Sequence, residues 1–241
     1  MIQEAIILAG GLGTRLKSVV HKVPKSLAPV AGKPFLEYLL QYAKKEGIEK
    51  FIFALGYKTE LIEAFVNSCL PARSFSLSIE EEPLGTGGAI YQACKQVIGQ
   101  HVIVLNADTF FGIRFSDLAK EHEARKADCT LALKPMQAFD RYGVVEMNAE
   151  GVISGFSEKK YREDGLVNGG IYALQVQTFL KKEYPPVFSF EQEYLQKQYP
   201  EGHFFGMISD AYFIDIGVPA DYQRAQTELL QNIFSQYGQG K

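Results

Sequence analysis

The sequence contains few cysteines and no cysteine motif. Cys69, Cys94 and Cys129 are an odd number, lie far apart and form no CxxC pair. Neither a disulfide framework nor a zinc site is therefore indicated. The four histidines are scattered as well, which is typical of ordinary core or surface positions rather than of a metal site.

Long apolar runs and an excess of one charge are also missing. No segment approaches the length of a membrane span, and the N-terminus lacks the charged and apolar regions of a cleaved leader. The net charge of −3 gives no electrostatic support for nucleic acid or an anionic membrane as a partner. We expect a protein of the reducing cytoplasm whose important basic residues are concentrated locally.

The first two-thirds of the chain alternate between strand-like and helix-like segments. The expected strands lie at 5–9, 51–55, 75–81, 101–105 and 128–134. The expected helices lie at 34–45, 58–68, from 85–88 to about 97, and 115–126. Repeated strand–helix units predict an α/β fold with a Rossmann-like, doubly wound, mostly parallel sheet and right-handed crossovers.

The pattern changes after about residue 140. Strands at 144–147 and 152–157 flank turn residues and predict a hairpin. The remaining expected elements are a strand at 167–173, a helix at 190–199, a strand at 213–216 and a closing helix at 218–234.

The chain has no linker, low-complexity segment or internal repeat, and its 241 residues suffice to bury a substantial core. We therefore expect a single domain over residues 1–241. Its first half, about 1–140, carries the strand–helix units. Its second half, about 141–241, is expected to be a smaller inserted β/α portion with a closing helix, which folds over the sheet edge and supplies the pocket of a second ligand.

The most informative segment is LAGGLGTRL at 8–16, followed by VPKSLAPVAGKP at 23–34. The residues that follow the first expected strand include Gly10, Gly11, Gly13 and Thr14. Glycines let backbone N–H groups approach a bulky anion closely, and Arg15 and Lys25 bring two cations to the same loop. This pattern predicts a phosphate site at the carboxyl end of a strand, where open α/β sheets bind ligands.

Two common nucleotide-binding patterns are absent from this loop. GGxGTR differs from the dinucleotide fingerprint GxGxxG, and no acidic residue ends the second expected strand. The Walker pattern is also missing, because no Lys-Ser or Lys-Thr pair follows the last glycine. What remains is GGxGTRL, followed by Pro-Lys with the lysine ten residues after the arginine.

With these motifs the sequence resembles the sugar-1-phosphate nucleotidyltransferases over nearly its whole length. EPLGTGGAI, NADTFF, YGVVE and FSFEQEYL together look most like the D-glycero-D-manno-heptose 1-phosphate guanylyltransferases of bacterial surface-polysaccharide pathways. Mannose-1-phosphate guanylyltransferases and glucose-1-phosphate uridylyl- or thymidylyltransferases share most of these positions, so base and sugar stay open. No hexapeptide repeats of a β-helix domain are present.

The resemblance implies the reaction of an NTP with a sugar 1-phosphate to give an NDP-sugar and pyrophosphate. Two alternatives remain: a non-catalytic regulatory homologue, and a transferase that uses another phosphorylated acceptor. The presence of the family's charged residues argues against the first, and the intact NGGIY segment argues against the second. The expected partners are small molecules only, and the aromatic content leaves a homodimer open.

The resemblance also implies two sets of binding residues. The implied nucleotide-binding residues are Leu8, Gly10, Gly11, Gly13, Thr14, Glu82, Gly85, Thr86 and Gly87. The implied sugar-phosphate-binding residues are Asn106, Tyr142, Gly143, Glu158, Lys159, Asn168 and Gly169. Taken alone, the GTGG segment is equally typical of a helix start capped by Thr86, and Tyr142 of core packing.

Asp108 and Asp215 each follow a short apolar strand. A carboxylate at such a place is either a turn residue or a metal ligand. Mg²⁺ takes a few carboxylates and fills its octahedron with phosphate oxygens and water, and the resemblance implies that both residues hold this cofactor. It further implies that Arg15, Lys25 and Asp108 are catalytic through positioning and charge neutralisation, without a nucleophilic side chain.

Overall fold

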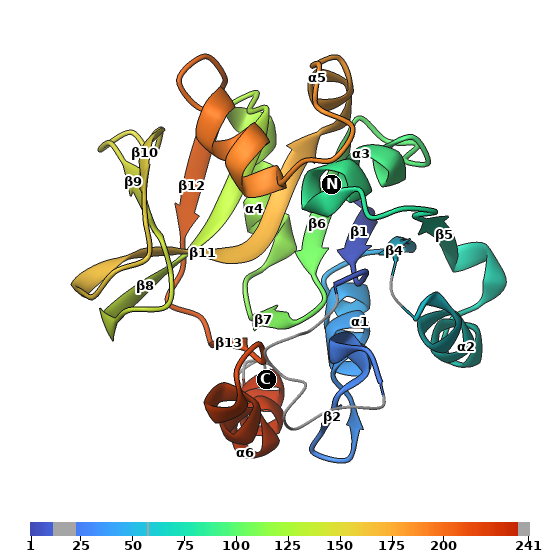
Figure 1. The fold of residues 1–241 in the computed structure, drawn as a ribbon. Helices are drawn as coiled ribbons and strands as arrows, with labels where there is room; N and C mark the ends of the chain where they lie inside the picture. Colours follow the sequence, from blue (N-terminus) through green and yellow to red (C-terminus); the bar gives the residue numbers. More distant parts are fainter. Residues whose placement is uncertain (12–22, 57, 236–241) are drawn as a thin grey trace.

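The structure is a computed structural model that describes residues 1–11, 23–56 and 58–235. In these residues a nine-stranded mixed sheet forms the centre of the molecule (Figure 1). Its parallel part has the order β5-β4-β1-β6. These strands are β1 Glu4–Leu8, β4 Lys50–Leu55, β5 Phe75–Ile79 and β6 His101–Asn106. The strand order reverses between β1 and β6, which is the place where open α/β sheets bind ligands.

Helices cover both faces of this sheet, as the strand–helix alternation predicts. The helices on one face are α1 Phe35–Lys45, α2 Thr59–Cys69, α4 Phe115–Ala124 and α6 Pro219–Ser235. Those on the other are α3 Gly85–Cys94, α5 Val176–Leu180 and the π-helix η4 Phe190–Gln196. Neighbouring strand residues point to opposite faces, so Ile6 joins one core cluster and Ile7 the other. Burial on both faces explains why β1, β4 and β6 are mainly apolar.

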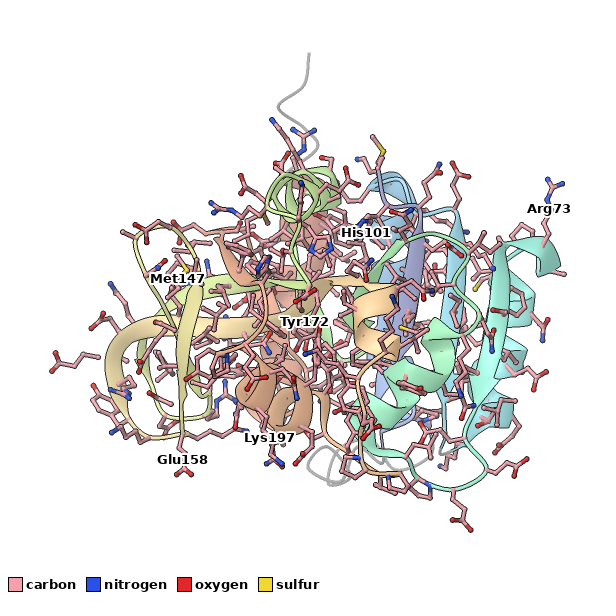
Figure 2. The ribbon with its side chains drawn as sticks, turned by 90° about the horizontal axis from the view of Figure 1, so that it is seen from above. Arg73, His101, Met147, Glu158, Tyr172 and Lys197 are labelled. Atoms are coloured by element: carbon pink, nitrogen blue, oxygen red, sulfur yellow. The ribbon has the colours of Figure 1, made fainter. Side chains whose placement is uncertain are left out.

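The second half of the chain enters the sheet instead of folding over its edge. The 14-residue strand β11 Arg162–Gln175 pairs antiparallel with both β6 and β8 Cys129–Phe139, and it lies between them. Tyr172, near its C-terminal end, is buried in the interior of the molecule (Figure 2). At the outer side of β8, β12 Phe204–Ile208 pairs in parallel. The expected edge position is therefore wrong for β11. The strand can lie inside the sheet because hydrogen bonds to β6 and β8 satisfy the polar groups of its backbone.

The hairpin expected after residue 140 is confirmed by β9 Val144–Met147 and β10 Ile153–Ser157, which pair antiparallel. The elements that were not expected include β7 Thr109–Phe111, β12 and α5. The remaining short elements are η2 Lys25–Leu27, β2 Pro29–Val30, β3 Lys33–Pro34, η3 Ala72–Ser74 and β13 Phe213–Asp215. None of the described helices has both the length and the apolar character needed to cross a membrane.

Candidate active site

The first predicted loop begins where β1 and β6 end side by side. The register pairs Leu8 with Asn106, and the N–H of Ala107 donates to the carbonyl of Leu8 at 3.1 Å. Just beyond β1 the backbone of Gly10 passes close to β4, because a Cβ on Gly10 would lie 2.9 Å from the nitrogen of Gly56. Only glycine fits at that distance. The chain therefore enters the predicted phosphate loop in close contact with the segment that follows β4.

A short ladder brings Asp108 and Asp215 together from distant parts of the chain. β13 pairs antiparallel with β7, and in this register Asp215 lies opposite Thr109. The N–H of Ile216 donates to the carbonyl of Asp108 at 3.0 Å. The two predicted metal ligands are thus held at one place by backbone pairing.

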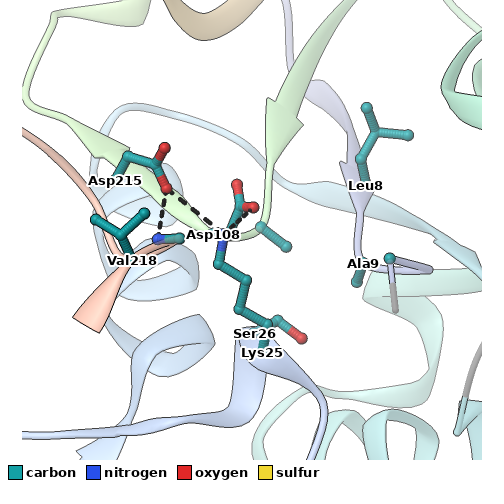
Figure 3. Close-up of a pocket in the computed structure, with 10 residues that line it drawn as sticks. Leu8, Ala9, Lys25, Ser26, Asp108, Asp215 and Val218 are labelled. Atoms are coloured by element: carbon teal, nitrogen blue, oxygen red, sulfur yellow. Dashed lines mark hydrogen bonds and ion pairs between the residues drawn. The ribbon is translucent and has the colours of Figure 1, made fainter. Parts of the chain in front are cut away.

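Lys25 lies between these two carboxylates (Figure 3). Its Nζ donates to Oδ2 of Asp108 at 2.5 Å and lies 3.5 Å from Oδ1 of Asp215. The lysine side chain is only 15% exposed, so its charge is poorly screened by water. Three residues that the sequence predicts for catalysis and metal binding therefore form one charged cluster.

The cluster holds two negative charges close together around one positive charge. Burial raises the pKa of Asp215, and the neighbouring charge of Asp108 raises it further. Lys25 lowers that pKa, as does the hydrogen bond that the Gly217 N–H donates to Oδ1 of Asp215 at 2.7 Å, but the net direction is upward. An additional cation at this place relieves the repulsion between the carboxylates.

The carboxylate oxygens in the cluster fit a hard cation. Among the described residues no group of three or more His, Cys, Asp or Glu side chains converges on one point. Two carboxylates nevertheless suit Mg²⁺, because this ion keeps several waters and binds substrate phosphates rather than occupying an all-protein cage. Asp108 and Asp215 are the side chains that would hold it.

Two cavities meet at this carboxylate pair. The first, here termed the loop cavity, has about 290 Å³ and is lined by Leu8, Gly11, Lys25 and Ser26, among others. The second, the Lys159 cavity, has about 460 Å³ and is lined by Asn106, Arg141, Tyr142, Lys159 and Asn168, among others. Asp108, Asp215 and Val218 line both. The carboxylates thus form a common wall between two spaces.

Polar side chains of the Lys159 cavity are fixed by their own contacts. The Asn168 side chain donates from Nδ2 to the Tyr172 hydroxyl at 2.7 Å and accepts from the Gly170 N–H at 3.0 Å. The ring of Tyr142 packs edge-on against Phe213, and burial raises the pKa of its hydroxyl. Tyr142 therefore both packs and lines the cavity, which combines the two interpretations that its sequence allowed.

The GTGG segment packs against Phe188 and does not line the loop cavity. Gly85 has a φ of +74°, and a Cβ on it would lie 2.5 Å from the carbonyl oxygen of Phe188. A Cβ on Gly87 would lie 2.2 Å from the Phe188 ring. Thr86 does not cap α3. Its hydroxyl accepts from the Phe190 N–H and donates to Glu191 Oε2, each at 2.9 Å, so it ties α3 to η4.

Other predicted residues also lie away from the cavity walls. Glu158 is exposed and points outward at the end of β10 (Figure 2). A Cβ on Gly143 would lie 2.8 Å from the Ser157 oxygen, and one on Gly169 would lie 2.3 Å from the Phe111 ring, so both glycines serve close packing. The predicted residues that line neither cavity are Gly10, Glu82, Gly85, Thr86, Gly87, Gly143, Glu158 and Gly169. Gly13, Thr14 and Arg15 lie outside the described residues.

The family follows from comparison with known proteins. A profile described as nucleotidyl transferase matches residues 4–232, almost the entire chain. The chain belongs to the nucleotidyl transferase family. Family membership agrees with a site made of two cavities lined by acidic and basic side chains, and with a Rossmann-like sheet.

Individual members of the nucleotidyl transferase family resemble this chain along most of its length. A D-glycero-alpha-D-manno-heptose 1-phosphate guanylyltransferase from Aneurinibacillus thermoaerophilus is 47% identical, over 94% of this chain and 98% of its own. A mannose-1-phosphate guanylyltransferase from Mycobacterium tuberculosis is 30% identical, over 95% of this chain but 65% of its own. The crystal structure of HddC from Yersinia pseudotuberculosis complexed with GMP-PN superposes with a TM-score of 0.84. It is 35% identical, over 95% of this chain and all of its own.

Sequence reasoning missed Arg141 and Ser26, both of which line a cavity. Each lies next to a residue that was singled out, Arg141 before Tyr142 and Ser26 after Lys25. Their adjacency was the available signal. Tertiary contacts determine the backbone turn at each motif. The turn then determines which residue next to the motif residue faces the cavity.

Proposed function

We propose that this protein transfers a guanylyl group from GTP to D-glycero-α-D-manno-heptose 1-phosphate, forming GDP-heptose for surface polysaccharide and pyrophosphate. One observation carries the proposal: two cavities share a wall made of Asp108 and Asp215, with Lys25 between the carboxylates. A transfer between two phosphates needs two binding spaces that meet at one charged point. Guanine and heptose are supported by the 47% identical relative and by the GMP-PN complex.

We assign the nucleotide to the loop cavity and the sugar phosphate to the Lys159 cavity. An oxygen of the sugar 1-phosphate attacks the α-phosphorus of GTP, and the bond from that phosphorus to the bridging oxygen of the β-phosphate breaks. Pyrophosphate leaves with that electron pair. No side chain needs to act as a nucleophile, because the acceptor is already an anion.

The main obstacle is repulsion between the two substrates, and the cations of the site address it. Lys25 reaches the common wall, and Lys159 lies on the acceptor side. Both draw phosphate oxygens toward the transfer point, which provides positioning and charge neutralisation. Mg²⁺ bound by Asp108 and Asp215 would neutralise phosphate charge there. With those carboxylates engaged by the ion, the Lys25 ammonium would be able to bind a phosphate oxygen.

A substrate matrix tests the proposal. The purified protein is incubated with Mg²⁺ and each of GTP, UTP, dTTP, CTP and ATP, against the 1-phosphates of heptose, mannose and glucose. Pyrophosphate release and the mass of the sugar nucleotide are measured. GTP with heptose 1-phosphate should give the highest kcat/KM, and Asp108→Asn should serve as the inactive control.

Two outcomes contradict the proposal in different ways. A higher kcat/KM with mannose 1-phosphate would keep the reaction but replace the acceptor, and one with UTP or dTTP would replace the base. No pyrophosphate release with any pair would favour the non-catalytic homologue. We also propose a cytoplasmic location, where nucleoside triphosphates are available. Size-exclusion chromatography with light scattering tests whether the protein forms a homodimer, which the sequence leaves open.

A further inference from the structure

Arg141 is a second cation of the Lys159 cavity. It lies in the turn between β8 and β9, directly before Tyr142, and its side chain lines the cavity together with Lys159. Among the described lining residues these two are the cations. The acids of the same cavity, Asp108 and Asp215, are already engaged by Lys25.

Asp221 holds the guanidinium of Arg141 from the side of α6. Asp221 is buried in the first turn of that helix, and its Oδ2 accepts a hydrogen bond from Nη2 of Arg141. The guanidinium carbon lies 5.6 Å from the centroid of the Tyr142 ring. A guanidinium carries five donors in one plane, so the bond to Asp221 and the contact with the Tyr142 ring restrict its direction and leave further donors for a ligand. Arg141 is therefore oriented in advance of binding.

The charge of Arg141 is only partly neutralised by this contact. Oδ1 of Asp221 accepts from Nη1 of Arg224 at 3.1 Å, so one carboxylate serves two arginines. Burial acts to lower the pKa of Arg141, but the hydrogen bond to Asp221 and the surrounding negative groups raise it overall. The guanidinium thus stays charged at the cavity wall. Its planar fork matches two oxygens of a phosphate.

We propose that Arg141 binds the phosphate of the sugar 1-phosphate beside Lys159, and that Asp221 is its positioning residue. This inference rests on the proposed function of the site. A phosphate close to a double negative charge needs two cations, and the two side chains differ in what they supply. Lys159 provides a point charge on a flexible stem, whereas Arg141 provides a fixed fork that restricts how the phosphate can turn. That restriction keeps one oxygen directed at the common wall.

The test compares Arg141→Met with Arg224→Gln, which alters the same ion-pair cluster without changing a residue that lines the cavity. In steady-state assays with GTP, Arg141→Met should raise KM for heptose 1-phosphate by about 10- to 100-fold, the range of a charged hydrogen bond. KM for GTP should change little. Arg141→Lys should recover part of the loss, because it keeps the charge but not the fork.

Asp221→Asn should raise the same KM by a smaller factor than Arg141→Met, while Arg224→Gln should leave it unchanged. Calorimetric titration with heptose 1-phosphate and with heptose lacking the phosphate adds a readout that needs no chemistry. Arg141→Met should weaken the binding of heptose 1-phosphate and leave the binding of heptose unchanged. Circular dichroism confirms folding of each variant, and Arg141→Lys replaces Arg141→Met if the latter does not fold.

The outcomes separate this inference from the proposed function. Unchanged KM and affinity in Arg141→Met, beside an active wild type, would overturn the role of Arg141 alone. An equal rise of KM for heptose 1-phosphate in Arg224→Gln would overturn it as well. That result would show that the ion pairs of Asp221 act through the stability of α6. A wild type that releases no pyrophosphate would overturn the proposed function, and the titrations would then still decide whether Arg141 binds the phosphate.

Discussion

Acidification should destabilise the fold through the buried His122 and its partner His101, which begins β6 at the end opposite to the charged cluster. His122 lies in α4 with no exposed surface. Its Nε2 is 3.0 Å from Nδ1 of His101, and its Nδ1 is 3.0 Å from the hydroxyl of Thr130. Burial, together with the neighbouring His101, lowers the pKa of His122 from 6.5 to about 4. The folded state therefore favours the neutral ring.

The magnitude follows from the difference between the two states. In the unfolded chain His122 takes up a proton near its ordinary pKa, whereas the folded chain resists until the pH nears 4. The stabilisation by the neutral ring is therefore fully present above about pH 6.5 and is lost as the pH falls toward 4. The loss is about 3 kcal/mol, because each tenfold change in a proton-binding constant is worth about 1.4 kcal/mol. Burial lowers the pKa of His101 as well, which acts in the same direction.

Urea denaturation at a series of pH values between 7.5 and 4.5 measures this effect. The wild type is compared with His122→Gln, which removes the titration, and with His203→Gln, which replaces an exposed histidine. The wild type and His203→Gln should lose about 2 to 3 kcal/mol more than His122→Gln across this range. Parallel loss in all three proteins would refute the assignment of the acid sensitivity to His122.

Three further predictions concern the site. Lys25→Ala should cut turnover by orders of magnitude and leave the melting temperature nearly unchanged, because its charge acts on the reacting phosphates; a rate near that of wild type would remove it from the mechanism. Lys159→Ala should raise KM for the sugar 1-phosphate and lower kcat with GTP affinity preserved, whereas Lys160→Ala, on an exposed neighbour that does not line the cavity, should do neither. Gly87→Ala should destabilise the fold by about 1 to 3 kcal/mol in denaturation, since its Cβ would overlap the ring packed on it, and an unchanged midpoint would contradict that packing.

The sheet could be predicted from sequence where the signal is local. Apolar runs such as 51–55 and 101–105 are buried on both faces, so their composition alone identifies them as strands. The place of β11 could not be predicted in this way, because pairing with β6 and β8 joins segments distant in sequence. β7 was not detected because three residues give too short a pattern. The strand β13 was expected, but its pairing with β7 could not be predicted from so few residues.

In the candidate site, too, the sequence identified some residues correctly but could not show what they contact. Lys25, Asp108 and Asp215 belong to recognisable motifs, and the structure brings all three together. The glycines of the GTGG segment also stand out in the sequence, and the structure shows Gly85 and Gly87 packed against Phe188. A motif therefore marks residues that must have a particular size or charge. It does not tell whether the reason is a ligand or a neighbouring side chain.

The ladder between β7 and β13 has a consequence for how the protein is made. Lys25 and Asp108 are 83 positions apart, and Asp215 follows only near the end of the described chain. Closing such long loops costs conformational entropy before any contact rewards it, so pairs of this kind form slowly and late. During synthesis from the N-terminus, the parallel strands that carry the loop cavity emerge well before β13. The charged cluster thus stays one carboxylate short until almost all of the described chain has left the ribosome, and a folding intermediate that lacks the β7–β13 ladder has no complete cluster.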